Sequence, residues 1–544
     1  MRDGEVVREI SLLGPTEPFE LPSDHRILAG RIEHICCKIS LNLRHINHKI
    51  EISLRYIYES MDASARERLR LVLQDMNPWW STGKVPLARE GIVPREEMDG
   101  LTYSLQNELA TSLIGPRQVG KTTMLHQCIR SLIEDKGVRP REVLFVDLDR
   151  PYLLSGLERH LNEILETYAQ SVLRRDVTEG PERVWVFLDE VCTLPDWERV
   201  LKGWVDRHAP VKFVFSDSSI TALIKGQGKS MTGRVNIQRV WPTGLLDTMR
   251  IGGADIPRDA VEASRTALIR ALSTGDVEGV VGQLTVAHSA LYPLRTAIEA
   301  ALDDYLIWGG YPGLIGLPPE DRRARLETIV DLTLARDVEE VYGVREPLLL
   351  RNLAGLLAQE LSGLLKTSSV AGDLSHDRST VERHIGYLVE AGVVVLSPQL
   401  TGRARSSARK EKKIRMRAPA LANALASMLD PTTFAQSGRA PRVMENVVAM
   451  HLGALETRGG GSFLNPPRFW RTQGAEVDVV VEFAGVPLPV EVKHAGSVRP
   501  NDRRGVERFL ETWDAPLGIV AHRGELELEP PVLEVPLWLL LMLC

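Results

Sequence analysis

The sequence predicts an α/β fold in which a mainly parallel sheet lies between two layers of helices. Over residues 61–250, short apolar segments that suit buried strands alternate with segments whose apolar residues recur at helical spacing. Two of the apolar segments end in residues that can bind a phosphate or a metal ion, as parallel strands do at their carboxyl ends. We therefore expect a three-layer core with a binding site at one edge of its sheet.

Residues 115–122 connect the first expected strand, 108–114, to an expected helix, 123–133. They fit the phosphate-loop pattern G-x-x-x-x-G-K-S/T at each fixed position. Glycines permit the sharp turn that directs backbone N–H groups at a phosphate chain, and the helix that follows adds the positive end of its dipole. Lys121 is expected to reach the β- and γ-phosphates of ATP, and the Thr122 hydroxyl to bind Mg²⁺. The residues expected to bind the nucleotide here are Gly115, Pro116, Arg117, Gln118, Val119, Gly120, Lys121, Thr122 and Thr123.

A second apolar segment, 183–191, contains the acidic pair Asp189 and Glu190. In a parallel sheet these carboxylates emerge beside the phosphate loop. We expect Asp189 to bind Mg²⁺ directly or through water, and Glu190 to position and polarise the water that attacks the γ-phosphate. A P-loop ATPase core is the fold that joins these two motifs.

Further candidates follow later strands of the core. Ser216 and Ser218 come directly after the apolar segment 211–215 and could sense the γ-phosphate, although serines are also common in turns. Arg234 could reach the same phosphate within the chain or from a second copy, and it also suits an ordinary surface position. A contribution from a second copy would make the protein a homo-oligomer.

Composition sets further limits. A chain of 544 residues predicts three or four domains, and 44% hydrophobic with 25% charged residues is typical of soluble globular proteins. The net charge of −6 excludes a general polycation, so any nucleic-acid surface must be local. Five cysteines without zinc spacing favour a reduced, cytoplasmic protein. The apolar tail 535–544 is too short to span a bilayer and is expected to be a last buried strand, so no membrane association is expected.

Residues 346–400 have the pattern of a winged helix-turn-helix. Three short helical segments precede the strand-like segment 393–397, and Arg378, Thr380 and Arg383 lie where the second helix of such a motif contacts the DNA major groove. The basic run, residues 402–417, follows directly and suits phosphate contacts. An interdomain adaptor with a solvated basic loop is the alternative.

The last part of the chain contains a second candidate site. Asp478 lies in the expected strand 473–482, and Glu491 and Lys493 lie in the next, 488–493, with Glu445 in a helix upstream. Two carboxylates on adjacent strands can hold a divalent metal, with Lys493 orienting water rather than binding the metal. This is the pattern of PD-(D/E)xK nucleases, and a nuclease-like fold without cleavage is the alternative.

Together these segments resemble AAA-like ATPases of bacteria and archaea that carry a C-terminal domain of unknown function. The resemblance covers about residues 65–540, and it implies ATP and Mg²⁺ binding, a winged helix and a restriction-endonuclease-like α/β tail. Three departures stand out: Ser216-Asp-Ser-Ser replaces the usual Gly-Ser-Ser, no aspartate follows the wing near 419–421, and residues 1–60 have no counterpart. The segments that carry it are GPRQVGKTT (115–123), VFLDEVCTLPDW (186–197), FSDSSITALI (215–224), TGRV (232–235), GGYPG (309–313), ARDVEEVY (335–342), EN (445–446), EVDVVVE (476–482) and PVEVK (489–493).

The sequence thus predicts a P-loop ATPase of the AAA type that acts on or near DNA. Two alternatives stay open: an ATP-licensed, metal-dependent nuclease, and a nucleotide-gated adaptor whose nuclease-like tail does not cleave. The expected domains are an N-terminal extension of unassigned role at 1–60, the ATPase domain at 61–250, a helical lid or linker at 251–345, the winged helix-turn-helix at 346–430 and the nuclease-like domain at 431–544.

Overall fold

A computed structural model describes most of the chain after its first 65 residues. The chain divides into a unit of residues 1–69 and a unit of residues 70–544, and both candidate sites lie in the second. The extension 1–60, Ser219 and residues 403–410 of the basic run lie outside the described residues. The described ranges are 66–86, 93–150, 161–177, 182–194, 197–218, 231–402, 411–462 and 465–544.

The core of the ATPase region is a five-stranded parallel sheet in the order β2-β3-β4-β1-β5. Its central strands are apolar and buried because helices cover them on both faces, as parallel sheets require. This confirms the mainly parallel sheet that the sequence predicts. The strands are β1 (Ala110–Ile114), β2 (Val143–Asp147), β3 (Val184–Asp189), β4 (Val211–Asp217) and β5 (Val235–Arg239).

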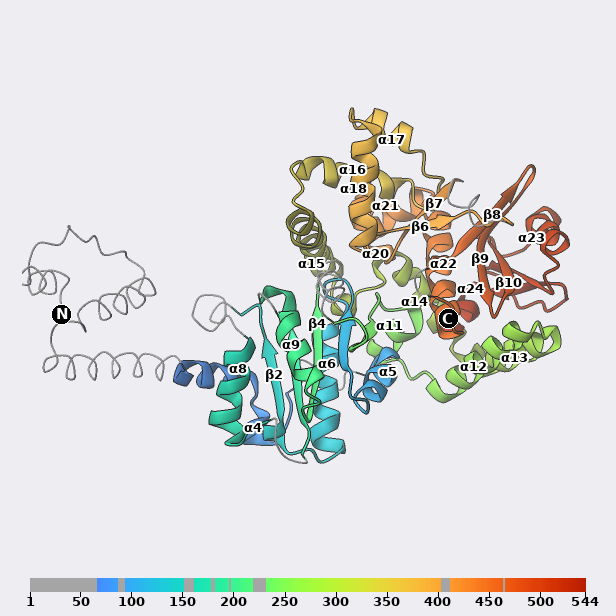
Figure 1. Cartoon of the computed structure of the whole chain (residues 1–544). Helices are drawn as coiled ribbons and strands as arrows, with labels where there is room; N and C mark the ends of the chain where they lie inside the picture. Colours follow the sequence, from blue (N-terminus) through green and yellow to red (C-terminus); the bar gives the residue numbers. More distant parts are fainter. Residues whose placement is uncertain are drawn as a thin grey trace, which may run out of the picture. The chain divides into compact units, whose positions relative to one another are not determined.

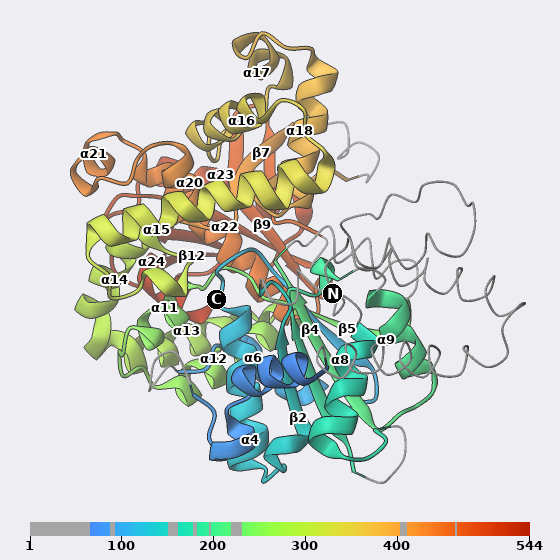
Figure 2. The ribbon, with the colours of Figure 1, turned by 90° about the vertical axis from the view of Figure 1, so that its left-hand side faces the viewer.

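Helices pack on both faces of this sheet, which makes the core three-layered. On one face His126 of α6 (Lys121–Arg130) contacts Phe145 at 4.5 Å between ring centroids. On the other, Trp197 of α9 (Trp197–Asp206) contacts Phe215 at 5.2 Å. Phe145 and Phe215 point to opposite faces because the strand register aligns Phe145 with the residue before Phe215. Figure 2 shows α6 and α9 on either side of the strands. Smaller flanking helices are α4 (Trp79–Thr82), α5 (Glu97–Ser104) and α8 (Leu161–Tyr168).

A helical region follows the core sheet, as predicted (Figure 1). A turn that contains Gly310 (φ 111°) and the short helix η6 (Pro312–Leu314) interrupts it after α14. The helix α15 continues directly into a π-helix, η7 (Thr333–Glu340), a conformation that occurs frequently at functional sites. The longer helices are α11 (Leu245–Ile251), α12 (Arg258–Thr274), α13 (Val277–Leu291), α14 (Arg295–Trp308) and α15 (Pro319–Leu332).

The next region contains three helices followed by a two-stranded antiparallel hairpin. The helices are α16 (Pro347–Gln359), α17 (Thr367–Asp373) and α18 (Arg378–Glu390), and the strands are β6 (Val394–Pro398) and β7 (Lys412–Met416). The order of elements is the one that the sequence predicts for this stretch. Two short helices, α20 (Pro419–Leu425) and α21 (Pro431–Gln436), lead to the last domain.

The last domain is a mixed sheet in the order β12-β11-β10-β9-β8 with helices packed against it (Figure 1). One prediction fails here: the strand ends at Pro536, and residues 537–543 form a helix packed on α12, α13 and α14. An unbroken apolar run has no periodicity that separates a buried strand from a buried helix. The elements are α22 (Ala440–Arg458), β8 (Arg468–Thr472), β9 (Ala475–Phe483), β10 (Val486–Val492), α23 (Pro500–Trp513), β11 (Gly518–His522), β12 (Val532–Pro536) and α24 (Leu537–Leu543).

No described helix combines the length and the hydropathy that a membrane-spanning segment needs. Two of the three described cysteines, Cys128 and Cys544, are buried, and all three are free thiols.

Candidate functional site

The phosphate loop connects the end of β1 to the first residue of α6. A Cβ atom at Gly115 would lie 2.0 Å from the carbonyl oxygen of Val240, so only glycine fits where the loop leaves the sheet. Gly120 has a φ of 100°, in the left-handed region that favours glycine, and it precedes Lys121 at the helix N-terminus. Both fixed glycines of the motif are therefore required by the local backbone.

Lys121 is the first residue of α6 and is only 5% exposed. Its ammonium donates hydrogen bonds to the carbonyl oxygens of Gly115 at 2.8 Å and Pro116 at 2.9 Å, rather than to a carboxylate of the described residues. Burial lowers the pKa of Lys121, while nearby carboxylates act in the opposite direction. An ammonium held by neutral carbonyls in a buried site keeps a strong attraction for an anionic ligand. The carboxylates that face it belong to Glu190, Asp189, Asp217 and Asp337.

Asp189 joins three elements of the site. One of its carboxylate oxygens accepts a hydrogen bond from the Thr122 hydroxyl, and the other accepts one from the Ser216 hydroxyl. The structure therefore brings α6, β3 and β4 together at the residues that the sequence predicts for Mg²⁺ binding. A carboxylate next to a threonine hydroxyl is the oxygen donor set that P-loop proteins offer Mg²⁺, with the phosphates and water supplying the rest. The described residues of the chain contain no group of three or more His, Cys, Asp or Glu that could hold a metal alone.

Glu190 follows directly and has a left-handed backbone with φ 54°. Such a backbone is costly for a residue other than glycine, and it is often found at functional sites. The Glu190 carboxylate accepts hydrogen bonds from the hydroxyl of Ser218 at 2.9 Å and from its backbone N–H at 3.3 Å. Burial, followed by the charge of Asp217, raises the pKa of Glu190 to about 7. A carboxylate with this pKa can accept a proton from water near neutral pH.

Each of the two candidate serines contacts one of the two acids: Ser216 bonds to Asp189, and Ser218 bonds to Glu190.

Arg234 does not lie at the site. It lies just before β5, at the amino end of the sheet, whereas the phosphate loop leaves the carboxyl end of β1. Its guanidinium pairs with Asp206. A role for Arg234 from within the same chain therefore does not fit this structure, and a role from a second copy stays a prediction.

Sequence reasoning missed the partner of Arg117. The Arg117 Nε donates to both carboxylate oxygens of Asp337, at 2.9 and 3.1 Å, and the Asp337 side chain is 6% exposed. Burial raises the pKa of Asp337 to about 6, although Arg117 acts in the opposite direction. Asp337 lies in the π-helix η7, within the segment 335–342 that has the family pattern but no predicted role. Its carboxylate is thus a contact between the helical region and the phosphate loop.

Two other contacts join the loop to the rest of the chain. Arg95 donates to the carbonyl oxygens of Val119 in the loop and of Trp241 after β5. Pro312 lies 3.8 Å from the position that a Cβ of Gly120 would take. The turn between α14 and α15 therefore approaches the loop directly.

The basic run gives a second correction. Lys413 and Arg415 do not face solvent: their side chains are 4% and 0% exposed and lie among carboxylates of the last domain. The guanidinium of Arg417 lies 3.9 Å from the ring centroid of Trp241. Strand periodicity explains the difference. Residues two apart in a strand point to the same face, so Lys413 and Arg415 both point toward the last domain. These cations are consequently not available for DNA phosphates in this conformation.

The residues of the predicted metal site of the last domain lie together, but lysine ammonium groups are already paired with them. Asp478 and Glu491 lie next to the last aligned pair of β9 and β10, Val479 with Val490, and Lys493 pairs with Glu491. Glu445 lies at the same place, and it bonds to Lys413 at 2.8 Å. Because the Lys413 ammonium already lies between Glu445 and Asp478, the residues present do not fit a divalent cation.

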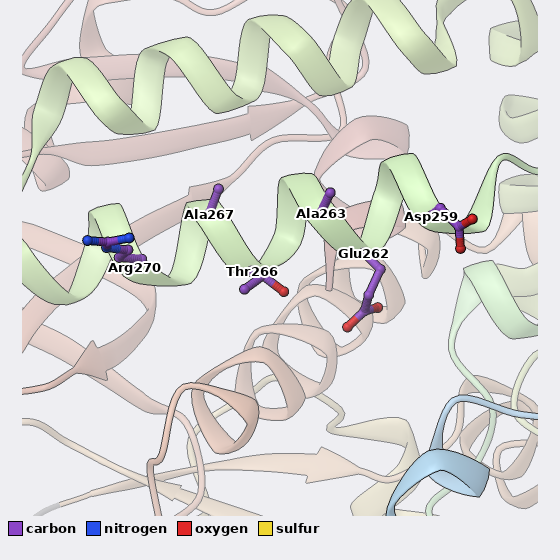
Figure 3. Close-up of a pocket in the computed structure, with 6 residues that line it drawn as sticks. All are labelled: Asp259, Glu262, Ala263, Thr266, Ala267 and Arg270. Carbon is purple, nitrogen blue, oxygen red and sulfur yellow. The ribbon is translucent and has the colours of Figure 1, made fainter.

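A hollow of about 480 Å³ lies elsewhere, along one side of α12. Figure 3 shows its six lining side chains on that single helix. None of them belongs to either predicted site. The lining residues are Asp259, Glu262, Ala263, Thr266, Ala267 and Arg270.

Three known families match parts of this chain. Residues 107–246 match an AAA domain. Residues 299–432 match the domain of unknown function DUF8612, and residues 441–538 match the domain of unknown function DUF4143. No curated protein matches the chain.

Solved structures resemble the chain only distantly. The Walker-type ATPase PABY2304 of Pyrococcus abyssi is 13% identical, with a TM-score of 0.35 over 62% of this chain and 98% of that chain. The S. cerevisiae Hsp104:casein complex is 16% identical, with a TM-score of 0.27 over 55% of this chain and 50% of that chain. Scores this low carry no argument about this protein. The family match, by contrast, supports the predicted class, because residues 107–246 are similar to an AAA domain.

Proposed function

We propose that the protein binds ATP with Mg²⁺ in the AAA domain and hydrolyses it. The observation that carries this proposal is the junction at which Thr122 and Ser216 bond to the two oxygens of Asp189, beside the carbonyl-held ammonium of Lys121. The residues present fit the cofactor: hydroxyl and carboxylate oxygens for Mg²⁺, and an ammonium and a helix N-terminus for phosphates.

Each residue has a distinct part in the proposed reaction. Lys121 and the backbone N–H groups of the loop bind the β- and γ-phosphates, and Thr122 and Asp189 hold Mg²⁺, which neutralises phosphate charge. Glu190 orients the attacking water and accepts its proton, and its raised pKa suits that task near pH 7. Ser218 positions Glu190 through the two hydrogen bonds that it donates.

We further propose that nucleotide binding changes the position of the helical region. The contact between Arg117 and Asp337 supports this, because phosphates entering the loop compete with Asp337 for the guanidinium. DNA is the proposed target, through α18, where Arg378 and Arg383 are exposed. The burial of Lys413 and Arg415 favours a second candidate, a nucleotide-gated adaptor whose last domain does not cleave nucleic acid.

The test is nucleotide binding and turnover by the full chain and one variant. Lys121→Ala should weaken the binding of ATP with Mg²⁺ by about 100-fold, because charge-assisted hydrogen bonds to the phosphates are lost. Isothermal titration calorimetry measures the affinity, and Lys136→Ala, which changes an exposed lysine beyond α6, is the matched control. Unchanged affinity in Lys121→Ala would refute the assigned site.

The same preparations test the DNA target. The ATPase rate of the wild type should rise when double-stranded DNA is added, and Arg378→Ala with Arg383→Ala should abolish the increase without lowering the rate in the absence of DNA. A wild-type rate that DNA does not alter would favour the adaptor.

A further inference from the structure

The acidic cluster of the last domain surrounds a lysine that belongs to the preceding hairpin. The Nζ of Lys413, on β7, lies 2.8 Å from Oε1 of Glu445, 2.8 Å from Oε1 of Glu476 and 3.0 Å from Oδ1 of Asp478. The ammonium donates hydrogen bonds to Glu445 and Asp478, and its contact with Glu476 is an ion pair. The contacts join β7 to α22 and β9, which are separate elements of the last domain.

Arg415 adds a second cation to the cluster, two residues along the same strand. Its guanidinium lies 2.8 Å from Oε1 of Glu445 and donates to the carbonyl oxygen of Asp478 at 3.0 Å and to the hydroxyl of Ser362 at 2.8 Å. Lys413 and Arg415 therefore share one carboxylate, Glu445. Both cations are nearly inaccessible to water, so neither can leave without moving the hairpin.

The charges of the cluster are close to balance. Four carboxylates face four cations, Lys413, Arg415, Arg471 and Lys493. Burial, and then the charge of Asp478, raises the pKa of Glu491 to about 8, and one of its buried oxygens has no hydrogen-bond partner among the described residues. A divalent cation placed between these carboxylates would repel an ammonium about 3 Å away. The four carboxylates are Glu445, Glu476, Asp478 and Glu491.

We infer that Lys413 is a built-in cation of this site, which takes the place that a divalent metal would need and fastens the hairpin β6–β7 to the last domain. The domain is therefore a docking module that neither binds a divalent metal nor cleaves nucleic acid while the hairpin is in place. Withdrawal of the hairpin would expose the carboxylates of Glu445 and Asp478. This inference does not depend on ATP binding, since none of its residues touches the phosphate loop.

The experiment is Mn²⁺ binding to the nucleotide-free full chain, measured by electron paramagnetic resonance. Lys413→Met should gain one bound Mn²⁺ per chain relative to wild type, and a second change, Asp478→Asn, should remove that ion. Lys412→Met, which changes the neighbouring lysine on β7, is the control and should gain none. The double variant Lys413→Met/Glu476→Gln removes one charge of each sign and should also gain the ion, which guards against loss of folding.

Two results would overturn the inference. A wild-type Mn²⁺ ion that Asp478→Asn removes would show that the metal binds with Lys413 in place. Folded Lys413→Met and folded Lys413→Met/Glu476→Gln that gain no ion would show that Lys413 does not occupy a metal position. Nicking of plasmid DNA by wild type, absent in Asp478→Ala, would refute the non-cleaving role.

Discussion

The phosphate-loop site and the acidic cluster of the last domain both contain a buried lysine near carboxylates, and they differ in how the lysine is held. In the AAA domain, Lys121 bonds to two carbonyl oxygens, and the carboxylate of Asp189 bonds to two hydroxyls. In the last domain, the ammonium of Lys413 lies within 3.0 Å of three carboxylates. The first lysine keeps its charge for a ligand, whereas the charge of the second is already neutralised.

The difference shows in the pKa of each lysine. Burial lowers the pKa of Lys121, and the surrounding carboxylates do not compensate for it. Burial also acts to lower the pKa of Lys413, but Asp478 and Glu445 outweigh it and the pKa is raised. A site whose cation lacks direct carboxylate partners is poised for an anionic ligand, and a site with a satisfied cation is a structural contact.

The largest expected effect is on ATP turnover, which should depend on the phosphate-loop site and not on the last domain. Glu190→Gln should lower the ATP turnover number by about 1,000-fold, because an amide cannot accept the proton of the attacking water. ATP affinity, measured by calorimetry, should stay within about threefold of wild type, because the phosphate contacts remain. Glu491→Gln, the corresponding change in the last domain, should leave turnover unchanged.

The pH profile gives an independent check on Glu190. Its carboxylate is active when deprotonated, so kcat/KM of wild type should rise with pH and reach half its maximum near pH 7. A flat profile between pH 6 and 8, or equal turnover of Glu190→Gln and wild type, would remove Glu190 from the reaction.

The next prediction compares how much Lys413 and Lys121 each contribute to the free energy of unfolding. Lys413→Met should lower the free energy of unfolding by about 3–5 kcal/mol at pH 7, because it leaves buried carboxylates without their cation. The sign follows from its raised pKa: the stabilisation is complete below the pKa of the unfolded lysine and is lost only as the pH rises through the higher folded value. Urea denaturation followed by circular dichroism measures the change.

Lys121→Met should change the unfolding free energy by about 1 kcal/mol or less, because removing a buried charge offsets the two lost hydrogen bonds. Equal losses in Lys121→Met and Lys413→Met would contradict the distinction between a ligand site and a structural contact.

A smaller effect on ligand binding concerns the contact between the helical region and the phosphate loop. Asp337→Asn should strengthen ATP binding by about 10-fold, because a carboxylate that competes for Arg117 and repels phosphate is removed. Fluorescence titration with a labelled ATP analogue measures it. Glu340→Gln, an exposed position of the same π-helix, is the control and should bind like wild type. Weaker binding by Asp337→Asn would instead assign Asp337 to holding the bound nucleotide.

Local patterns were enough to predict the AAA core. The glycine spacing of 115–122 and the acidic end of β3 depend on backbone constraints within a few residues. Both features can therefore be recognised in the sequence. Parallel strands then bring their carboxyl ends together, which is why Lys121, Thr122, Asp189 and Glu190 lie near one another. The last helix was missed because residues 537–543 are apolar at every position.

Charge pairing across long sequence distances could not be predicted in this way. Arg117 and Asp337 are 220 residues apart, and Lys413 and Asp478 are 65 apart. The sequence of a basic run is the same whether its side chains face solvent or a buried carboxylate. Local sequence does not determine which groups from distant parts of the chain pack against it.

The sequence by itself determined that the chain has a phosphate loop, an acidic strand end and a second acidic hairpin, since each is fixed by residues close together in the chain. Only the tertiary structure decided which lysine is neutralised and which keeps its charge for a ligand. The physical reason is that the energy of a charge depends on every group within a few ångströms of it, and folding alone brings those groups together.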